Sequence, residues 1–264
     1  MTACVAVICA MESEAVHLRR RLEQPHERQL SLWRRTTGML GPMEVEIIVS
    51  GIGLINAAAA TAVRLAATEP RPLAVFNYGC AGAHRDDIEA GDVIIGDRTV
   101  HTSSVIVLPD GGRRPFRFWS GHDVISDTET LGIDPHLLDL ATRMAGRTLL
   151  PAWPGVGHNP VVHVGAIASA DVWTQHGESI RTLHTEHGTL CEEMEAAAIA
   201  QVCAKFGVSF LPVKDISNNE LRQKTEHTSE GSLSLDDVRE QLGLRAALIV
   251  EATIVALGAS VAGG

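Results

Sequence analysis

The sequence predicts a three-layer α/β fold, in which helices cover both faces of a central sheet. Short apolar segments rich in Val and Ile alternate along the chain with segments of helical periodicity. Each apolar segment runs directly into small or polar residues, which is typical of strands that present loops at one edge of a sheet. The six predicted strands are residues 4–9, 44–49, 73–78, 91–97, 161–170 and 210–216.

The composition is that of a globular protein whose ligand is not a polyanion. With 264 residues and 45% hydrophobic content, the chain is expected to form one domain over residues 1–264. The net charge is −10, and the sequence has no basic run of five or more residues. We therefore expect no nucleic-acid partner.

The cysteines and the apolar runs of the sequence indicate the cellular compartment of the protein. Five cysteines stand in apolar segments without metal-ligand spacing, so we expect reduced thiols, a cytoplasmic location and no metal or other cofactor. The first apolar run, residues 3–10, lacks a basic leader, and no apolar run approaches the ~18 residues of a membrane span. We expect neither a signal peptide nor a membrane partner.

Two glutamates follow the first predicted strand, which ends in Ala10-Met11-Glu12-Ser13-Glu14. In open α/β sheets, ligands bind beyond the carboxyl ends of the strands, so Glu12 and Glu14 stand where a site is expected. Acids in a first helical turn also interact favourably with the helix dipole. From these residues alone, both a functional and a purely structural role are open.

Two glycine-containing loops follow the next strands. Ser50-Gly51-Ile52-Gly53 and Gly79-Cys80-Ala81-Gly82 leave room for a ligand, and glycine lets backbone amides approach an anion or a ribose. A Gly-x-Gly pair without a third glycine is a weak dinucleotide signal, so no Rossmann cofactor is expected. Cys80 has no histidine at a motif spacing, which favours a packed thiol over a nucleophile. The predicted lining residues are Ser50, Ile52, Cys80, Ala81 and Gly82.

The stretch 191–202 carries three acids before an apolar stripe at four-residue spacing, which predicts a helix headed by carboxylates. Glu192 is interpreted as a solvated charge at the helix start. Glu193 and Glu195 flank Met194 in an Ala-rich run, where an unpaired carboxylate is costly, so they are functional candidates. Trp173 follows another strand end, where it can stack on a planar ligand or pack as an ordinary core residue.

The C-terminal quarter contains the last strand, a polar segment and a final helix. The strand ends in Ser217-Asn218, and the polar segment 221–232 has the composition of a mobile loop. Residues 234–237, Ser-Leu-Asp-Asp, predict the capped start of the last amphipathic helix.

Five short motifs, taken together, resemble those of the purine nucleoside phosphorylase/uridine phosphorylase superfamily, and most closely the methylthioadenosine/S-adenosylhomocysteine nucleosidases. The motifs occur in order over nearly the whole chain: Ala-Met-x-x-Glu (10–14), Ser-Gly-Ile-Gly (50–53), Gly-x-Ala-Gly (79–82), Glu-Met-Glu-Ala (193–196) and Ile-Ser-Asn (216–218). The resemblance implies a nucleoside phosphorylase-like fold on a central mixed sheet. It also implies N-glycosidic bond cleavage and a homodimer whose partner subunit helps to close each site.

The resemblance also implies roles for individual residues. Glu14 would activate the attacking water, and Glu195 would accept hydrogen bonds from both ribose hydroxyls, with Met194 under the sugar. Glu193 would lie alongside in the same pocket, and Ser217 would line the site next to Asn218. The substitutions relative to the family are Trp173 for a Phe that stacks on the purine, Cys80 for a Ser, and Lys214 for an Arg.

Asn218 stands where the adenine-specific nucleosidases carry an Asp that protonates the leaving purine. An amide cannot transfer that proton, but it can present a donor and an acceptor together, which suits a 6-oxopurine. The resemblance agrees, because 6-oxopurine phosphorylases and futalosine hydrolases of the superfamily use Asn at this place. Asp215 is expected to face elsewhere on the strand but stays open as a substitute acid.

These observations predict an enzyme, a purine nucleosidase that hydrolyses the N-glycosidic bond of a 5′-substituted purine nucleoside, with a preference for 6-oxopurines. Water is favoured over phosphate because Glu12 and Glu14 would repel a phosphate dianion. Two alternatives stay open: a phosphate-dependent purine nucleoside phosphorylase, and a nucleoside-binding or storage protein with reduced chemistry. The presence of both Glu14 and Glu195 favours the enzyme.

Overall fold

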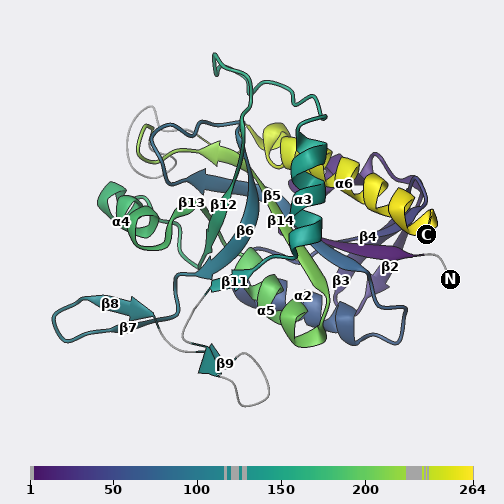
Figure 1. Cartoon of the computed structure of the whole chain (residues 1–264), viewed down its shortest axis with the longest axis horizontal. Helices are drawn as coiled ribbons and strands as arrows, with labels where there is room; N and C mark the ends of the chain where they lie inside the picture. Colours follow the sequence, from purple (N-terminus) through teal and green to yellow (C-terminus); the bar gives the residue numbers. More distant parts are fainter. Residues whose placement is uncertain are drawn as a thin grey trace.

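The computed structural model confirms the predicted α/β architecture with helices on both faces of a mixed sheet (Figure 1). It describes residues 3–115, 118–119, 125–126, 130–223, 234, 236 and 238–263. The helices are α1 (Glu12–Arg19), α2 (Leu54–Ala66), α3 (Pro135–Ala145), α4 (Gly177–His187), α5 (Ala196–Phe206), the 3₁₀ turn η1 (Arg239–Gln241) and α6 (Leu244–Ala262).

All six predicted strands are present, as β1 (Cys4–Cys9), β4 (Met43–Val49), β5 (Ala74–Ala83), β6 (Val93–His101), β12 (Val162–Ser169) and β14 (Ser209–Asn218). Four further strands join them in a ten-stranded sheet within the described residues: β2 (Glu23–Leu30), β3 (Trp33–Leu40), β11 (Thr130–Gly132) and β13 (Thr189–Glu193). Outside this sheet lie two short pairs, β7 (Val105–Val107) with β8 (Arg113–Pro115) and β9 (Phe118–Trp119) with β10 (Ile125–Ser126).

Five of the ten described strands of the sheet close into a ring. β5 pairs with β13, β13 with β12, β12 with β6, and β14 joins β6 back to β5, so these five strands form a ring. β1 and β4 extend the sheet from β5, and β1, β4, β5 and β14 run parallel within it. Because parallel strands end at the same edge, the loops after these four strands converge on one place.

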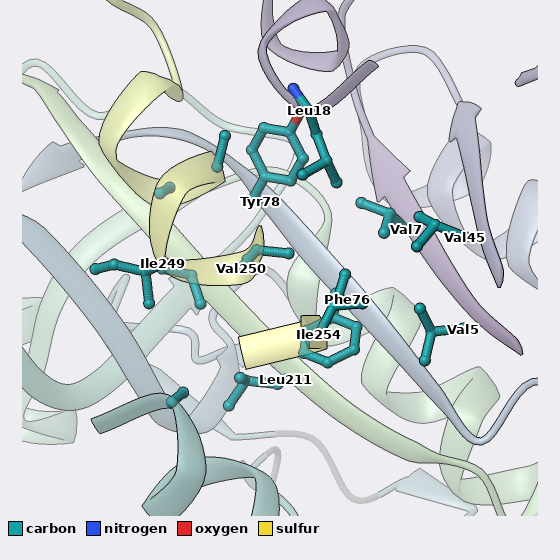
Figure 2. Packing of buried hydrophobic residues seen from close by; sticks show 14 of the residues in the cluster. Val5, Val7, Leu18, Val45, Phe76, Tyr78, Leu211, Ile249, Val250 and Ile254 are labelled. Atoms are coloured by element: carbon teal, nitrogen blue, oxygen red, sulfur yellow. Dashed lines mark hydrogen bonds between the residues drawn. The ribbon is translucent and has the colours of Figure 1, made fainter. Parts of the chain in front are cut away.

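Two hydrophobic clusters fill the space between the sheet and its two helical layers. Figure 2 shows the first cluster, in which Val7 and Phe76 of the sheet face Leu18 of α1 and Ile249 and Ile254 of α6. α3 contributes to the same cluster, and α2 and α5 cover the opposite face. The Tyr78 hydroxyl reaches α1, where it donates to the Glu14 carbonyl oxygen at 2.8 Å and accepts from the Leu18 amide at 3.4 Å.

Two segments differ from the sequence-based prediction. The acids at 192 and 193 belong to strand β13, and α5 begins only at Ala196, because β13 pairs with both β12 and β5. Residues 19–35, which lie outside the six predicted strands, contain β2 and the start of β3. β2 is exposed at every position but the last, so it lacks the apolar alternation that marks a half-buried strand.

The last helix also begins later than predicted, at Leu244 after the left-handed Gly243. Residues 235 and 237 of the expected helix start, and residues 224–232 of the polar segment, lie outside the described residues. By length and composition, the segment Arg239–Ala262 resembles a membrane span. More than half of its most apolar window is buried in the protein, and α6 supplies Ala246, Ile249 and Val250 to the core, which accounts for that apolar character.

Candidate active site

The converging loops enclose a cavity of about 190 Å³ at the carboxyl ends of the parallel strands. The structure brings eleven of the twelve predicted site residues together around it: Glu14, Ile52, Cys80, Ala81, Gly82, Trp173, Glu193, Met194, Glu195, Ser217 and Asn218. The walls of the cavity are mostly apolar, and four of the carboxylates that line it are buried. Buried carboxylates in a concave apolar site are the feature expected of a catalytic centre.

Ser50 is the predicted site residue that does not line the cavity. Its side chain is buried, and its hydroxyl lies 2.8 Å from the Gly51 carbonyl oxygen and 3.2 Å from that of Cys9. Its own carbonyl oxygen accepts from the Trp33 indole at 3.0 Å. In this structure Ser50 therefore fixes the loop after β4.

Glu14 is held in one orientation by backbone amides. It is 2% exposed, Oε1 accepts from the Cys80 amide at 2.9 Å, and Oε2 accepts from Met11 at 3.0 Å and Ala10 at 3.2 Å. A carboxylate has about four acceptor positions, so these three bonds leave roughly one for a ligand or a water. Burial raises the pKa of Glu14 above its ordinary value, although Lys214 and the amides lower it. A raised pKa makes the carboxylate a better proton acceptor.

The residues next to the Cys80 amide leave room for the Glu14 carboxylate. A Cβ atom at Gly79 would lie 2.4 Å from Glu14 Oε1, so only glycine allows the carboxylate to approach the strand. Burial and the neighbouring Glu14 raise the pKa of the Cys80 thiol well above its ordinary value. A thiol that holds its proton is a poor nucleophile, which agrees with the prediction that Cys80 lines the site.

Glu195 is the second buried carboxylate, and the glycine turn after β4 holds it. Oε1 accepts from the Gly53 amide at 2.8 Å, at a residue whose φ of +104° requires glycine. The next amide, of Leu54, donates to Asp171 at 2.8 Å. Burial, followed by repulsion from Glu193, raises the pKa of Glu195 to about 8, although Lys214 and the Gly53 amide lower it. The amides of this turn are thus occupied by two side chains of the protein itself, Glu195 and Asp171.

Glu193 lines the same cavity, but the protein occupies its carboxylate. Its oxygens accept from the Ala196 amide at 3.0 Å and from the Ser169 hydroxyl, and Oε2 accepts from the Glu195 amide at 3.0 Å. Lys214 Nζ lies 2.8 Å from Oε2, and both side chains are almost fully buried. Glu193 therefore caps the start of α5 and pairs with Lys214.

Lys214 places a positive charge among three carboxylates. Burial lowers its pKa, but the carboxylates of Glu193, Glu195 and Glu14 raise it by more, so the ammonium stays charged. A buried cation beside carboxylates lowers the cost of keeping them ionised. The sequence showed Lys214 only as a departure from the family, and its proximity to Glu193 follows from the strand order.

Asn218 is the last residue of β14, and hydrogen bonds hold both the oxygen and the nitrogen of its side-chain amide. Oδ1 accepts from the Ser217 hydroxyl at 2.7 Å, and Nδ2 donates to Glu220 at 3.0 Å. Asp215, which the sequence left open as a substitute acid, is fully buried and does not line the cavity. It accepts from the Arg245 amide at 2.9 Å and pairs with the Arg245 guanidinium. The structure thus separates Asp215 from Asn218.

Further lining residues were not predicted as site residues. Glu192, interpreted from sequence as a solvated charge, is partly buried, and its two oxygens accept from the Thr174 amide and hydroxyl, each at 2.9 Å. His84 is 3% exposed, and burial lowers its pKa to about 3, so its imidazole is neutral. His84 Nδ1 bonds to the Thr189 hydroxyl, whereas Nε2 has no partner among the described residues.

The mouth of the cavity is apolar and exposed. Ile52, Val172 and Trp173 line it with about half of each side chain in solvent. Trp173 is therefore accessible to a ligand or to another protein surface. The described part of the chain holds no group of three or more His, Cys, Asp or Glu side chains arranged to bind a metal ion.

The fold and the site define an α/β protein of the nucleoside phosphorylase type, with a carboxylate-lined cavity at the carboxyl ends of its parallel strands. Residues 5–255 match the model of the phosphorylase superfamily, and the chain belongs to this family. The resemblance drawn from the five motifs is thereby confirmed.

Similar sequences support the same family, and solved structures support the same fold. The chain is 32% identical to the 5′-methylthioadenosine/S-adenosylhomocysteine nucleosidase of Mycobacterium bovis, over 83% of this chain and 86% of the relative. It is 30% identical to the enzyme of the same name from Chromohalobacter salexigens, over 96% and 97%. The fold matches S-adenosylhomocysteine nucleosidase from Streptococcus pyogenes (TM-score 0.75, 23% identity, 97% and 98% covered). It also matches a futalosine hydrolase mutant of Helicobacter pylori (TM-score 0.77, 21% identity, 96% and 98% covered).

Proposed function

We propose that the protein is a purine nucleosidase, which hydrolyses the N-glycosidic bond of a 5′-substituted purine nucleoside. The observation that carries the proposal is that two buried carboxylates, Glu14 and Glu195, and the amide of Asn218 line one apolar cavity. The relatives named above are nucleosidases for 5′-substituted adenine nucleosides, which supports the same reaction here.

The chemistry follows from the polarity of the bond that breaks. As the C1′–N9 bond opens, positive charge develops on the ribose and negative charge on the purine, so acceptors are needed near the sugar and donors near the base. Glu14 takes a proton from water as the water oxygen attacks C1′. Glu195 accepts from the ribose hydroxyls, and the Asn218 N–H donates to the departing base.

The exposed mouth supports a homodimer. Ile52, Val172 and Trp173 are apolar side chains at the entrance, and a second subunit placed over them would shield the 5′ substituent from water. The five thiols are free, which supports a reducing compartment such as the cytoplasm.

Base release is expected to need no phosphate. The purified protein should release purine from 5′-methylthio- or S-homocysteinyl nucleosides at the same rate in phosphate-free and phosphate-containing buffer, and should yield the free sugar. The reason is that the buried carboxylate of Glu14 lines the cavity and repels a phosphate dianion. Formation of ribose 1-phosphate would establish the phosphorylase alternative, and ligand binding without base release would establish the binding-protein alternative.

The base preference is proposed from Asn218. Because an amide donates a hydrogen bond but cannot transfer a proton, a base that tolerates negative charge should leave faster, and a 6-oxopurine can spread that charge onto O6. We expect wild type to favour inosine-type over matched adenosine-type substrates in competition kinetics. Asn218→Asp should shift the ratio of kcat/KM toward adenosine by ~10-fold or more. A wild-type protein that strongly prefers adenosine would refute this preference.

A further inference from the structure

We propose that Glu192 is a specificity-determining residue, whose carboxylate accepts a hydrogen bond from N1–H of a 6-oxopurine while Asn218 donates to N7 on the other side of the same base. The inference rests on the proposed nucleosidase function and names the base that the cavity selects. The sequence presented Glu192 as a solvated charge at a helix start, and only its place in the sheet brings it to the cavity.

Glu192 and Asn218 stand at the same level of three neighbouring strands. Glu192 of β13 and Asn218 of β14 are both in register with Gly82 of β5, which lies between them. Residues in register across neighbouring strands present their side chains on the same face of the sheet. Because neighbouring strands are about 4.8 Å apart, the backbones of Glu192 and Asn218 are separated by roughly 10 Å.

The space between these two side chains is open because residue 82 is a glycine. Gly82 lines the cavity, as do Glu192 and Asn218. A Cβ atom at Gly82 would lie 3.3 Å from Asn218 Nδ2, so any larger side chain on the middle strand would crowd the amide. The three residues thus form a slot with a carboxylate on one side and an amide on the other, which suits the flat ring of a base.

Asn218 faces this slot as a donor. Its carbonyl oxygen accepts from the Ser217 hydroxyl at 2.7 Å, and one N–H is directed to Glu220 at 3.0 Å. A side-chain amide has two N–H groups, so the second is left for the base. N7 of a purine can accept from that N–H. A donor on the far side of the base then has to be recognised by Glu192.

Thr174 holds the Glu192 carboxylate in one orientation. The two oxygens accept from the Thr174 amide and hydroxyl, each at 2.9 Å, and a carboxylate has about four acceptor positions, so roughly two remain. The side chain is only partly buried and lines the cavity, so a ligand can reach it. Burial raises the pKa of Glu192, although the bonds from Thr174 lower it. An N–H from a ligand would therefore stabilise the ionised form further.

N1–H is the group that a carboxylate at this place selects. Hypoxanthine carries a hydrogen on N1 and accepts at N7, so it complements Glu192 and Asn218 at once. Adenine also accepts at N7, but its N1 is a lone pair, which a carboxylate repels. A site that bonds an N–H discriminates strongly against a base without it, because the protein group then stays unpaired. Glu192 thus adds selective binding to the leaving-group preference proposed for Asn218.

The test compares 5′-methylthioinosine with its 1-methyl derivative, which keeps the ring and O6 but has no N1–H. Wild type should favour the unmethylated nucleoside in kcat/KM. Glu192→Gln replaces the charged acceptor by a neutral one, so the ratio of the two kcat/KM values should fall roughly fivefold to tenfold. Glu192→Ala removes the acceptor, and the ratio should fall roughly ten- to a hundredfold. Because Gln fills the same space as Glu, Glu192→Gln separates the hydrogen bond from steric exclusion of the methyl group.

Thr174→Val is the matched control for a purely structural role of the Glu192–Thr174 contact. It removes the hydroxyl bond to Glu192 but leaves the carboxylate in the cavity. It should lower kcat/KM for both nucleosides alike and keep their ratio near that of wild type. An unchanged ratio in Glu192→Gln, or an equal fall in Thr174→Val, overturns the inference.

The wild-type protein separates this inference from the function on which it rests. If wild type releases adenine from 5′-methylthioadenosine but no base from 5′-methylthioinosine, the role of Glu192 is refuted and the nucleosidase function stands. If wild type releases no base from any of the three nucleosides, the proposed function fails, and the inference fails with it.

Discussion

Glu14→Gln is expected to lower the turnover number by ~10²–10⁴, the usual cost of losing a general base. Gln has the same shape, but its amide nitrogen cannot accept a proton, and it cannot accept the three amide bonds that now fix the carboxylate. Ligand binding should change much less, because the carboxylate acts on the attacking water. Single-turnover base release together with inhibitor titration would separate the two effects.

Glu12→Gln provides the control from the same helix. Glu12 lies two residues earlier, is exposed, and pairs with Arg19 at 2.8 Å away from the cavity. Surface ion pairs of this kind contribute little, so turnover should stay close to wild type. Near-normal turnover in a folded Glu14→Gln protein would remove Glu14 from the mechanism.

The sequence predicted the centre of the fold better than its margins, for a physical reason. Strands such as β1 are buried on both faces, so their unbroken apolar runs are visible in the sequence. β2 is an exposed edge strand, and its sequence resembles a polar connection. β13 looked like a helix start because its acids are followed immediately by the apolar stripe of α5.

The candidate site was predictable where a motif coincides with a strand end. Glu14 and Glu195 follow strands, Asn218 is the last residue of one, and the structure brings all three to one cavity. Sequence spacing does not reveal which lone pairs the protein itself occupies. The carboxylate of Glu193 is bonded to Ser169, Lys214 and the α5 amides, and the carbonyl of Asn218 is bonded to Ser217. Those assignments need the tertiary structure.

Glu195→Ala is expected to lower kcat/KM by ~10²–10⁴, since each charged hydrogen bond contributes about 1.5–3 kcal/mol and the ribose has two hydroxyls to lose. The loss should depend on those hydroxyls. Wild type should process a 2′-deoxynucleoside much more slowly than the ribonucleoside, whereas the variant should treat the two nearly alike. If the variant discriminates as wild type does, another residue holds the diol.

The pH dependence gives an independent readout of the same carboxylate. Burial and the adjacent Glu193 raise the pKa of Glu195 to about 8, so in the free protein the group holds a proton below that pH. Because only the ionised form supports the positive charge on the ribose, kcat/KM should rise with pH up to about 8. Glu195→Gln should remove that rise, whereas a wild-type kcat/KM that stays flat from pH 6 to about 8 would contradict the assignment.

The raised pKa of Glu195 also determines how the free energy of unfolding changes with pH. From the ordinary carboxyl pKa of 4.5 up to about 8, the folded protein keeps a proton on Glu195 that the unfolded chain has released. The free energy of unfolding should therefore fall as pH rises through this window, because the unfolded state binds fewer protons. Glu195→Gln removes this contribution, so its stability should depend less on pH than that of wild type in chemical denaturation. Equal slopes for the two proteins would show that Glu195 is ionised throughout the window, and Lys214 would then be the group that keeps it charged.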